Sequence, residues 1–170
     1  IAEHRQMKNP EDLKKIKVCF LGDGNNVAHS WLLAGGVIGM EVTVSSPKGY
    51  EAESPFVKRA QDLASRSGGK ISLVSDPLVA ASGADVVYTD VWASMGKDDE
   101  RETRKKVFMP YQLNAPLLAF AKPDAMIMHC LPAHRGEEIT DEVMENPRSV
   151  VFTQAENRLH MQKAILLDLI

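Results

Sequence analysis

Hydrophobic residues along the chain gather into six short runs, rich in β-branched side chains, that are separated by longer mixed stretches. Each run is nearly continuous rather than alternating with polar residues, which is typical of strands buried on both faces of a parallel sheet. The runs therefore predict strands over residues 18–21, 42–44, 71–74, 86–89, 125–128 and 150–152.

The stretches between these runs are predicted to be helices. Four stretches have helical patterns, and they cover residues 26–39, 97–121, 140–145 and 155–170; prolines split the second of these into two pieces. Two further helices are expected, one that begins at Ser54-Pro55 with Ser54 as its cap and one that begins at Asp76-Pro77. Because strand and helix alternate, the fold class is α/β: a doubly wound, mainly parallel, Rossmann-like sheet with right-handed crossovers and helices on both faces.

Composition and charge narrow the class of protein. A chain of 170 residues can bury one proper core, and its 44% hydrophobic and 25% charged residues are typical of a soluble globular protein. The net charge of −3 gives no attraction to nucleic acid or to an anionic membrane, and no apolar run approaches the roughly 18 residues of a membrane helix. We expect a single α/β domain over residues 1–170 that binds neither nucleic acid nor membrane.

Polar and reactive side chains follow the ends of most predicted strands. They stand in the segments Gly22-Asp23-Gly24-Asn25-Asn26, Ser45-Ser46-Pro47, Asp90-Val91-Trp92-Ala93-Ser94-Met95-Gly96, His129-Cys130-Leu131-Pro132 and Gln154-Ala155-Glu156-Asn157-Arg158. Ligands of open α/β sheets bind outside the carboxyl ends of the strands, so these segments predict a cleft there. Solvated loops are also polar, but they have no need of Trp, Met and Cys.

The two glycines after the first run begin a dinucleotide-binding pattern that the chain does not complete. Val27 stands where a third glycine belongs, and Ser45 stands where an acid would bind a ribose. A tight strand-to-helix turn is therefore favoured over nicotinamide binding. Asn25 and Asn26 begin the helix that follows, where they either cap it or bind a carboxylate or phosphate.

The two cysteines differ in position. Cys19 lies within a predicted strand and is expected to be a core thiol, whereas Cys130 ends one and either faces the cleft with a shifted pKa or is structural. Two cysteines make no disulfide framework, which favours a reducing, cytoplasmic compartment. The spacing of His129, Cys130 and His134 matches no common zinc pattern, so no metal is expected.

Two charged residues complete the candidate site. Asp90 ends the fourth predicted strand, where a carboxylate binds a cationic amine or caps a turn. Arg158 falls in the first turn of the expected last helix. A cation is unfavourable there unless Glu156, a bound phosphate or a carbonyl compensates it.

Four motifs, in this order, resemble the ornithine-binding domain of the ornithine carbamoyltransferases, within the aspartate/ornithine carbamoyltransferase family. They are Asp23-Gly24-Asn25-Asn26-Val27-Ala28-His29-Ser30, Asp90-Val91-Trp92-Ala93-Ser94-Met95-Gly96, His129-Cys130-Leu131-Pro132 and Ala155-Glu156-Asn157-Arg158. The resemblance runs from about residue 17 to the end of the chain. Aspartate-specific relatives lack the Ser-Met-Gly loop and the cysteine of His-Cys-Leu-Pro, so these residues favour ornithine.

The resemblance implies transfer of a carbamoyl group from carbamoyl phosphate to the side-chain amine of L-ornithine, giving L-citrulline and phosphate. It implies a role in arginine biosynthesis, and it implies no cofactor or metal. It implies that Asn26, with Asn25 nearby, binds the α-carboxylate of ornithine, and that Asp90, Ser94 and Met95 contact the rest of the amino acid. It also implies that carbamoyl phosphate contacts Cys130, Leu131 and Arg158. Cys130 would accept a proton or position the amine, and Arg158 would compensate charge on the carbonyl oxygen.

The same resemblance implies an amino-terminal domain that is absent from this chain. That domain holds most of the carbamoyl phosphate site, including a Ser-x-Arg-Thr-Arg motif, and the only Thr-Arg here, Thr103-Arg104, stands in a charged helix. The chain opens on Ile1 rather than Met, as expected of a piece of a longer protein. We expect the isolated chain to be inactive and the full-length protein to be a homo-oligomer, a trimer or a multiple of one.

Three alternatives stay open. The chain could instead be a stand-alone amino-acid-binding module or regulator, or part of a carbamoyltransferase for putrescine or an acylated ornithine. The last helix bears on this choice, because Ile165, Leu166, Leu167, Leu169 and Ile170 exceed one apolar stripe. We expect this end to be exposed, frayed or in contact with another copy unless the amino-terminal domain covers it.

Overall fold

The computed structural model describes residues 1–93 and 101–170. Its centre is a five-stranded sheet in the order β3-β2-β1-β4-β5, and all four strand pairs are parallel. The strands are β1 (Lys17–Leu21), β2 (Glu41–Ser45), β3 (Lys70–Val74), β4 (Val86–Thr89) and β5 (Met126–His129). The chain winds from β1 out to β3 and then returns to β4 on the other side of β1, which confirms the doubly wound α/β class.

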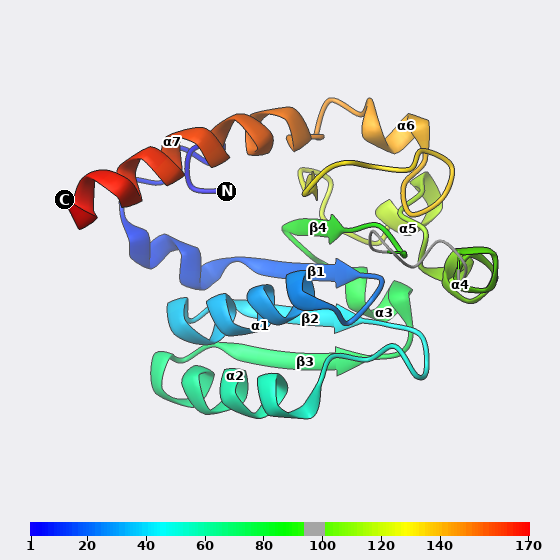
Figure 1. Ribbon diagram of the computed structural model, residues 1–170, viewed down its shortest axis with the longest axis horizontal. Helices are drawn as coiled ribbons and strands as arrows, with labels where there is room; N and C mark the ends of the chain where they lie inside the picture. The colour runs from blue at the N-terminus through cyan, green and yellow to red at the C-terminus, as the bar shows by residue number, and fades with distance from the viewer. Residues whose placement is uncertain (94–100) are drawn as a thin grey trace.

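Helices cover both faces of this sheet (Figure 1). On one face lie α1 (Asn26–Ile38) and α2 (Ser54–Ser67), and on the other lie α3 (Pro77–Ala81), α5 (Ala115–Leu118) and α6 (Asp141–Met144). Beyond the carboxyl ends of the strands lie α4 (Arg101–Phe108) and the 3-10 turn η3 (Met109–Tyr111). A 3-10 helix, η1 (Pro10–Lys15), precedes β1, and α7 (Val151–Leu169) ends the chain.

Successive side chains of β1, β4 and β5 enter opposite cores, as the continuous apolar runs predict, whereas the edge strand β3 leaves Leu73 41% exposed. In β1, Val18 and Phe20 pack into the core under α1 and α2, whereas Cys19 and Leu21 pack into the core under α3 and α5. All four side chains are fully buried. Burial of one large aliphatic or aromatic side chain contributes roughly 1.5–3 kcal/mol, so both faces of the sheet stabilise the fold.

The sixth predicted strand is wrong. Residues 150–152 do not add to the sheet, because α7 begins at Val151 and Val150 is its N-cap. The chain touches the sheet edge only briefly here: the Val150 amide donates to the carbonyl of Ile127 at 3.0 Å, beside an isolated bridge between Ile127 and Ser149. A three-residue apolar run cannot distinguish a short strand from the first turn of a helix.

The helix starts agree with the sequence where a side chain caps them. Asn25 caps α1 and Asp76 caps α3, each accepting hydrogen bonds from two amides of the first turn. The predicted cap of α2 is wrong, because Ser54 lies inside the helix and Glu53 occupies the N-cap without a side-chain hydrogen bond. Among the described residues, no helix combines the length and apolar character that crossing a membrane would require.

Candidate functional site

The carboxyl ends of β1, β4 and β5 meet where the strand order reverses. Ligands of doubly wound sheets bind at this switch point, because the loops on its two sides diverge to opposite faces. The loop after β1 carries Asn25, the loop after β4 carries Asp90, and Cys130 follows β5 directly. Since β4 pairs with both β1 and β5, Asp90 lies between the other two residues.

Asn25, Asp90 and Cys130 form a continuous hydrogen-bonded row. The Cys130 thiol donates to Oδ1 of Asp90 at 2.9 Å, and the Asn25 amide Nδ2 donates to Oδ2 at 3.2 Å. The backbone N–H of Val91 also donates to Oδ1 of Asp90 at 2.8 Å. The structure thus brings two of the predicted site residues, Asn25 and Cys130, to the carboxylate of a third, Asp90, which is only 7% exposed.

The pKa of Cys130 is raised to about 12 from its ordinary value near 9. Burial is the largest cause, and the hydrogen bond to Asp90 and the negative charge of that carboxylate act in the same direction. The resting group at neutral pH is therefore the neutral thiol. This arrangement favours positioning of an amine over acceptance of its proton by a preformed thiolate.

Asn25 and Asn26 have different roles. Oδ1 of Asn25 accepts from the amides of Val27 at 2.9 Å and Ala28 at 3.3 Å, so this side chain caps α1 while it also binds Asp90. Asn26, the first residue of α1, is exposed. Asn25 therefore orders the loop, and Asn26 offers its amide at the positive end of the helix dipole.

A buried pair that the sequence analysis missed supports the turn after β5. Nε2 of His129 lies 3.1 Å from Oε1 of Glu138, and both side chains are fully buried. The Leu131 amide donates to Nδ1 of His129 at 2.9 Å and so helps to hold Leu131 at a φ of 55°. In the sequence, Glu138 is one of several polar residues in a loop, so its burial could not be predicted and is visible only in the folded structure.

Tyr88 was also missed, although strand periodicity could have found it. It lies two residues before Asp90 in β4, and its hydroxyl accepts from Nε2 of Gln154 at 3.1 Å. Burial raises the pKa of Tyr88, and the neighbouring Cys130 adds to this effect. The neutral phenol therefore lies beside the thiol and links it to α7.

Arg158 does not occupy the predicted position. Because α7 begins at Val151 rather than near residue 155, Arg158 lies in its third turn and not in its first. It is exposed, lies one turn beyond Gln154, and forms no hydrogen bond or ion pair with another residue in the described ranges. Ser94 and Met95 fall outside the described residues, and Leu131 is half-buried beside Cys130.

The glycines after β1 serve the turn and its packing. Gly22 has a φ of 126°, which other residues rarely adopt. A Cβ on Gly24 would lie 2.2 Å from the Ala52 nitrogen, because the backbone of residues 51–52 packs directly on this glycine. The space that a dinucleotide pyrophosphate would need beside Gly24 is therefore filled, which agrees with a tight turn.

One cluster of potential metal ligands lies outside this row. Ligand atoms of His134, Glu137 and Glu138 lie within 4.8 Å of one another. However, Glu137 is paired with Arg101 at 2.7 Å, and Oε1 of Glu138 already accepts from His129 and from the His134 amide. The cluster is thus held together by protein donors and does not include Cys130.

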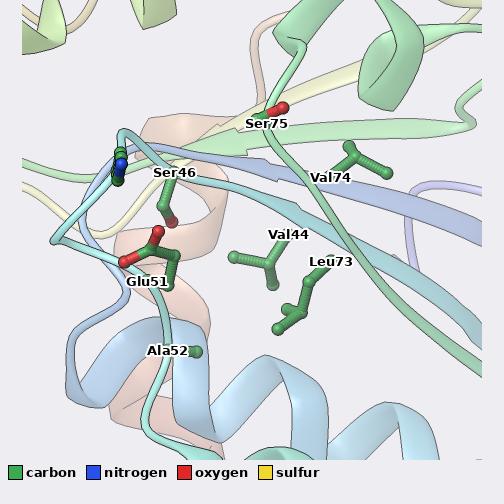
Figure 2. A pocket seen from close by; sticks show the side chains of 8 residues that line it. Val44, Ser46, Glu51, Ala52, Leu73, Val74 and Ser75 are labelled. Carbon is green, nitrogen blue, oxygen red and sulfur yellow. The ribbon is translucent and has the colours of Figure 1, made fainter.

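A cavity of about 400 Å³ opens at the carboxyl ends of β2 and β3, away from this row. Figure 2 shows the side chains of Val44 and Leu73, which are paired residues of β2 and β3, lying side by side at the cavity, with Glu51 and Ser46 at one side. None of its lining residues belongs to the row of Asn25, Asp90 and Cys130. The candidate site is therefore defined by its polar contacts rather than by the cavity.

Comparisons with known proteins give a consistent picture. A family model described as the Asp/Orn-binding domain of aspartate/ornithine carbamoyltransferase matches residues 14–169. An anabolic ornithine carbamoyltransferase of Pyrococcus furiosus is 56% identical over 154 residues, covering 91% of this chain and 49% of that protein. An ornithine carbamoyltransferase of Synechocystis sp. is 53% identical over 169 residues, covering 94% of this chain and 54% of that protein.

Solved structures of carbamoyltransferases have the same fold as this chain. An ornithine carbamoyltransferase from Pyrococcus furiosus superposes with a TM-score of 0.90 at 53% identity, covering 98% of this chain and 51% of its own. An N-acetyl-L-ornithine transcarbamylase reaches 0.85 at 29% identity, covering 99% of this chain and 53% of its own. The chain spans about half the length of the curated relatives that it matches.

Proposed function

Because this chain belongs to the Asp/Orn-binding domain family of the aspartate/ornithine carbamoyltransferases, we propose that it is the ornithine-binding half of an ornithine carbamoyltransferase. The reaction joins the side-chain nitrogen of L-ornithine to the carbonyl carbon of carbamoyl phosphate, releasing phosphate and giving L-citrulline. The hydrogen bond between the Cys130 thiol and Asp90 carries this proposal, because it places a buried carboxylate and a thiol together at the switch point.

The chemistry requires an amine that has lost a proton. An alkyl ammonium has a pKa of about 10.4 in water and must become neutral before its nitrogen can attack the carbamoyl carbon. As the new C–N bond forms, the bond from that carbon to the phosphate oxygen breaks, and the departing phosphate takes up the proton that the nitrogen loses. Asp90 attracts an ammonium group of ornithine, and Cys130, as a neutral thiol, orients the attacking nitrogen.

The remaining contacts follow the family resemblance. Asn26 takes the α-carboxylate, with Asn25 ordering the loop, and Ser94 and Met95 contact the rest of the amino acid. Leu131 and Arg158 contact carbamoyl phosphate. The exposure of Arg158 supports this role, since a cation that forms no ion pair with residues 1–93 or 101–170 remains available to the charge that develops on the carbonyl oxygen.

The whole protein includes an amino-terminal carbamoyl phosphate domain in this proposal, and it is a cytoplasmic homo-oligomer, a trimer or a multiple of one. The chain's coverage of about half of each relative supports the second domain. The exposed apolar end of α7 supplies a surface for it to pack on. Two free cysteines, one fully buried, support a reducing compartment.

Related amines are the second candidate class of substrate. Ornithine is favoured over an acylated ornithine because this chain is 53% identical to the solved ornithine carbamoyltransferase but only 29% identical to the acetylornithine enzyme. Putrescine lacks the α-carboxylate that Asn26 is proposed to bind. A stand-alone amino-acid-binding module would explain Asp90, but it gives no reason for the Cys130 thiol beside it.

Assay of the natural full-length gene product tests the proposal. We expect citrulline from carbamoyl phosphate and L-ornithine, and at least about tenfold lower kcat/KM with putrescine or N-acetyl-L-ornithine, a difference of about 1.4 kcal/mol. Asp90→Asn should abolish most of this activity, because it removes the charge that attracts the amine. A gene product that forms no citrulline and binds ornithine with a nanomolar Kd would instead establish a binding module.

A further inference from the structure

Arg104 is buried although it lies in the charged part of a helix. The helix α4 has the sequence Arg-Glu-Thr-Arg-Lys-Lys-Val-Phe, yet Arg104 is only 4% exposed and Phe108, one turn later, is fully buried. An arginine cannot lose its charge in a protein, and burying an ion costs several kcal/mol unless it is paired and hydrogen-bonded. Its contacts therefore matter to the arrangement around it.

The guanidinium of Arg104 contacts three loops at once. Its Nη1 donates to Oδ2 of Asp23 at 2.9 Å and to the carbonyl of Trp92 at 2.9 Å. Its Cζ lies 4.8 Å from the centroid of the Tyr50 ring. These residues follow β1, β4 and β2 respectively, so one side chain ties together the loops after three neighbouring strands.

Two of these loops carry the row at the switch point. Asp23 is two residues before Asn25, and Trp92 is two residues after Asp90. The third loop joins the first, because the Gly24 amide donates to the carbonyl of Tyr50 at 2.8 Å. Arg104 therefore braces the loops on both sides of the Asn25–Asp90 hydrogen bond.

We propose that Arg104 is a positioning residue: it fixes the distance between the loops after β1 and β4 and thereby sets the affinity for the amino acid substrate. The inference rests on the proposed function and deepens it. A planar guanidinium can donate to a carboxylate and a carbonyl while one of its faces lies on an aromatic ring. A lysine ammonium offers a charge but not this planar arrangement, so Arg104→Lys is expected to restore only part of the function.

Steady-state kinetics of the full-length protein test the proposal. Arg104→Met is expected to raise the KM for ornithine at least about tenfold and Arg104→Lys at least about threefold, tenfold being about 1.4 kcal/mol. The KM for carbamoyl phosphate should change less than about twofold, because the loops after β1 and β4 that Arg104 contacts carry residues proposed to bind the amino acid. Lys105→Met is the matched control: it removes the same charge from the next residue of α4, and its ornithine KM should stay within about twofold.

Asp23→Asn provides a second variant that removes only the ion pair, and its ornithine KM should rise at least about threefold. The double variant Asp23→Asn/Arg104→Met should show less than the product of the two single effects, because both changes break one contact. Ornithine KM values within twofold of wild type in Asp23→Asn or in a folded Arg104→Met would overturn the inference. A wild-type protein that forms no citrulline would instead refute the proposed function.

Discussion

At the scale of single residues, the site depends on how one carboxylate is shared. Asp90 accepts from the Cys130 thiol, the Asn25 amide and the Val91 backbone, so it is held from three sides and keeps little exposure. Burying a carboxylate costs less free energy when donors satisfy its oxygens, as the thiol and the two N–H groups do here. It also keeps the thiol protonated, which makes Cys130 a cysteine of low reactivity.

That low reactivity gives a testable pH dependence. Cys130 is protonated below its raised pKa of about 12, so at pH 8 it should react with iodoacetamide about a thousandfold more slowly than a thiol of pKa 9. The rate should rise steadily as the pH increases toward 12. A Cys19→Ala background leaves Cys130 as the only thiol, and adding Asp90→Asn should lower its pKa and speed the reaction at pH 8 at least about tenfold. Fast alkylation at pH 8 without that change would contradict this assignment.

The two cysteines should also differ in catalysis. In the full-length protein, Cys130→Ala is expected to lower turnover at least about tenfold, a transition-state loss of about 1.4 kcal/mol. Cys19→Ala should mainly lower the free energy of unfolding, because Cys19 is fully buried in the core under α3 and α5. Measured kcat values and urea unfolding midpoints separate the two effects, and equal losses of activity would reject the distinction.

At the scale of elements, the loops matter as much as the helices and strands they join. The segment between β2 and α2 packs its backbone onto the turn between β1 and α1, and it reaches that position only because residue 24 has no side chain. The last helix shows the opposite situation. Only Val151 of α7 is buried, and every residue of its carboxyl half is exposed.

The close packing at Gly24 predicts that substitution of two glycines by alanine will lower the free energy of unfolding by different amounts. Gly24→Ala should destabilise the chain by about 3 kcal/mol, because a Cβ there would overlap the backbone of residues 51–52. Gly49→Ala is the control: no atom lies within 4 Å of its added Cβ, so only its positive φ of 87° should cost about 1 kcal/mol. Free energies of unfolding from urea titrations compare the two, and similar values would contradict the close packing at Gly24.

The exposed helix end predicts tolerance to polar residues. Leu166 and Leu169 are 63% and 77% exposed, so Leu166→Lys/Leu169→Lys should change the free energy of unfolding of this chain by less than about 1 kcal/mol. Val151→Ala, at a fully buried position, should cost about 2 kcal/mol. Analytical ultracentrifugation should also show that the double lysine variant self-associates less than the parent chain, since it removes apolar surface. A large loss of stability would mean that these side chains are covered.

At the scale of the whole molecule, the site lies at one edge of the sheet, and in the proposed full-length protein it would form one wall of a cleft between two domains. Asn25, Asp90 and Cys130 lie at the carboxyl edge of the sheet, and the exposed face of α7 extends away from that edge (Figure 1). A ligand bound to one wall keeps much of its surface in water and gains less from burial than one enclosed on two sides. The proposed second domain would supply the other wall.

The isolated chain should accordingly bind L-ornithine weakly. Isothermal titration calorimetry is expected to show no binding tighter than about 1 μM, which corresponds to about −8 kcal/mol. The full-length protein with carbamoyl phosphate present should bind ornithine more tightly than the chain alone, because a closed site buries more of the ligand. A nanomolar constant for the isolated chain would favour a stand-alone amino-acid-binding module.

Local information in the sequence was enough for the fold class and for part of the site. Continuous apolar runs determine strands buried on both faces, and short polar segments after them determine where Asn25, Asp90 and Cys130 lie along the sheet edge. The same information was insufficient for residues 150–152, because three apolar residues fit the start of a helix as well as a strand. The resulting shift moved Arg158 from the first turn of α7 to the third.

Tertiary structure alone decided which polar residues are buried and what they contact. Arg104 belongs to a run of charged residues and Glu138 to a polar loop, and neither neighbourhood predicts burial. Both are buried because distant segments close over them: Asp23, Tyr50 and Trp92 around Arg104, and His129 beside Glu138. Hydrophobic periodicity depends on neighbours in the sequence, whereas the burial of a charge depends on partners that only the folded chain brings within hydrogen-bonding distance.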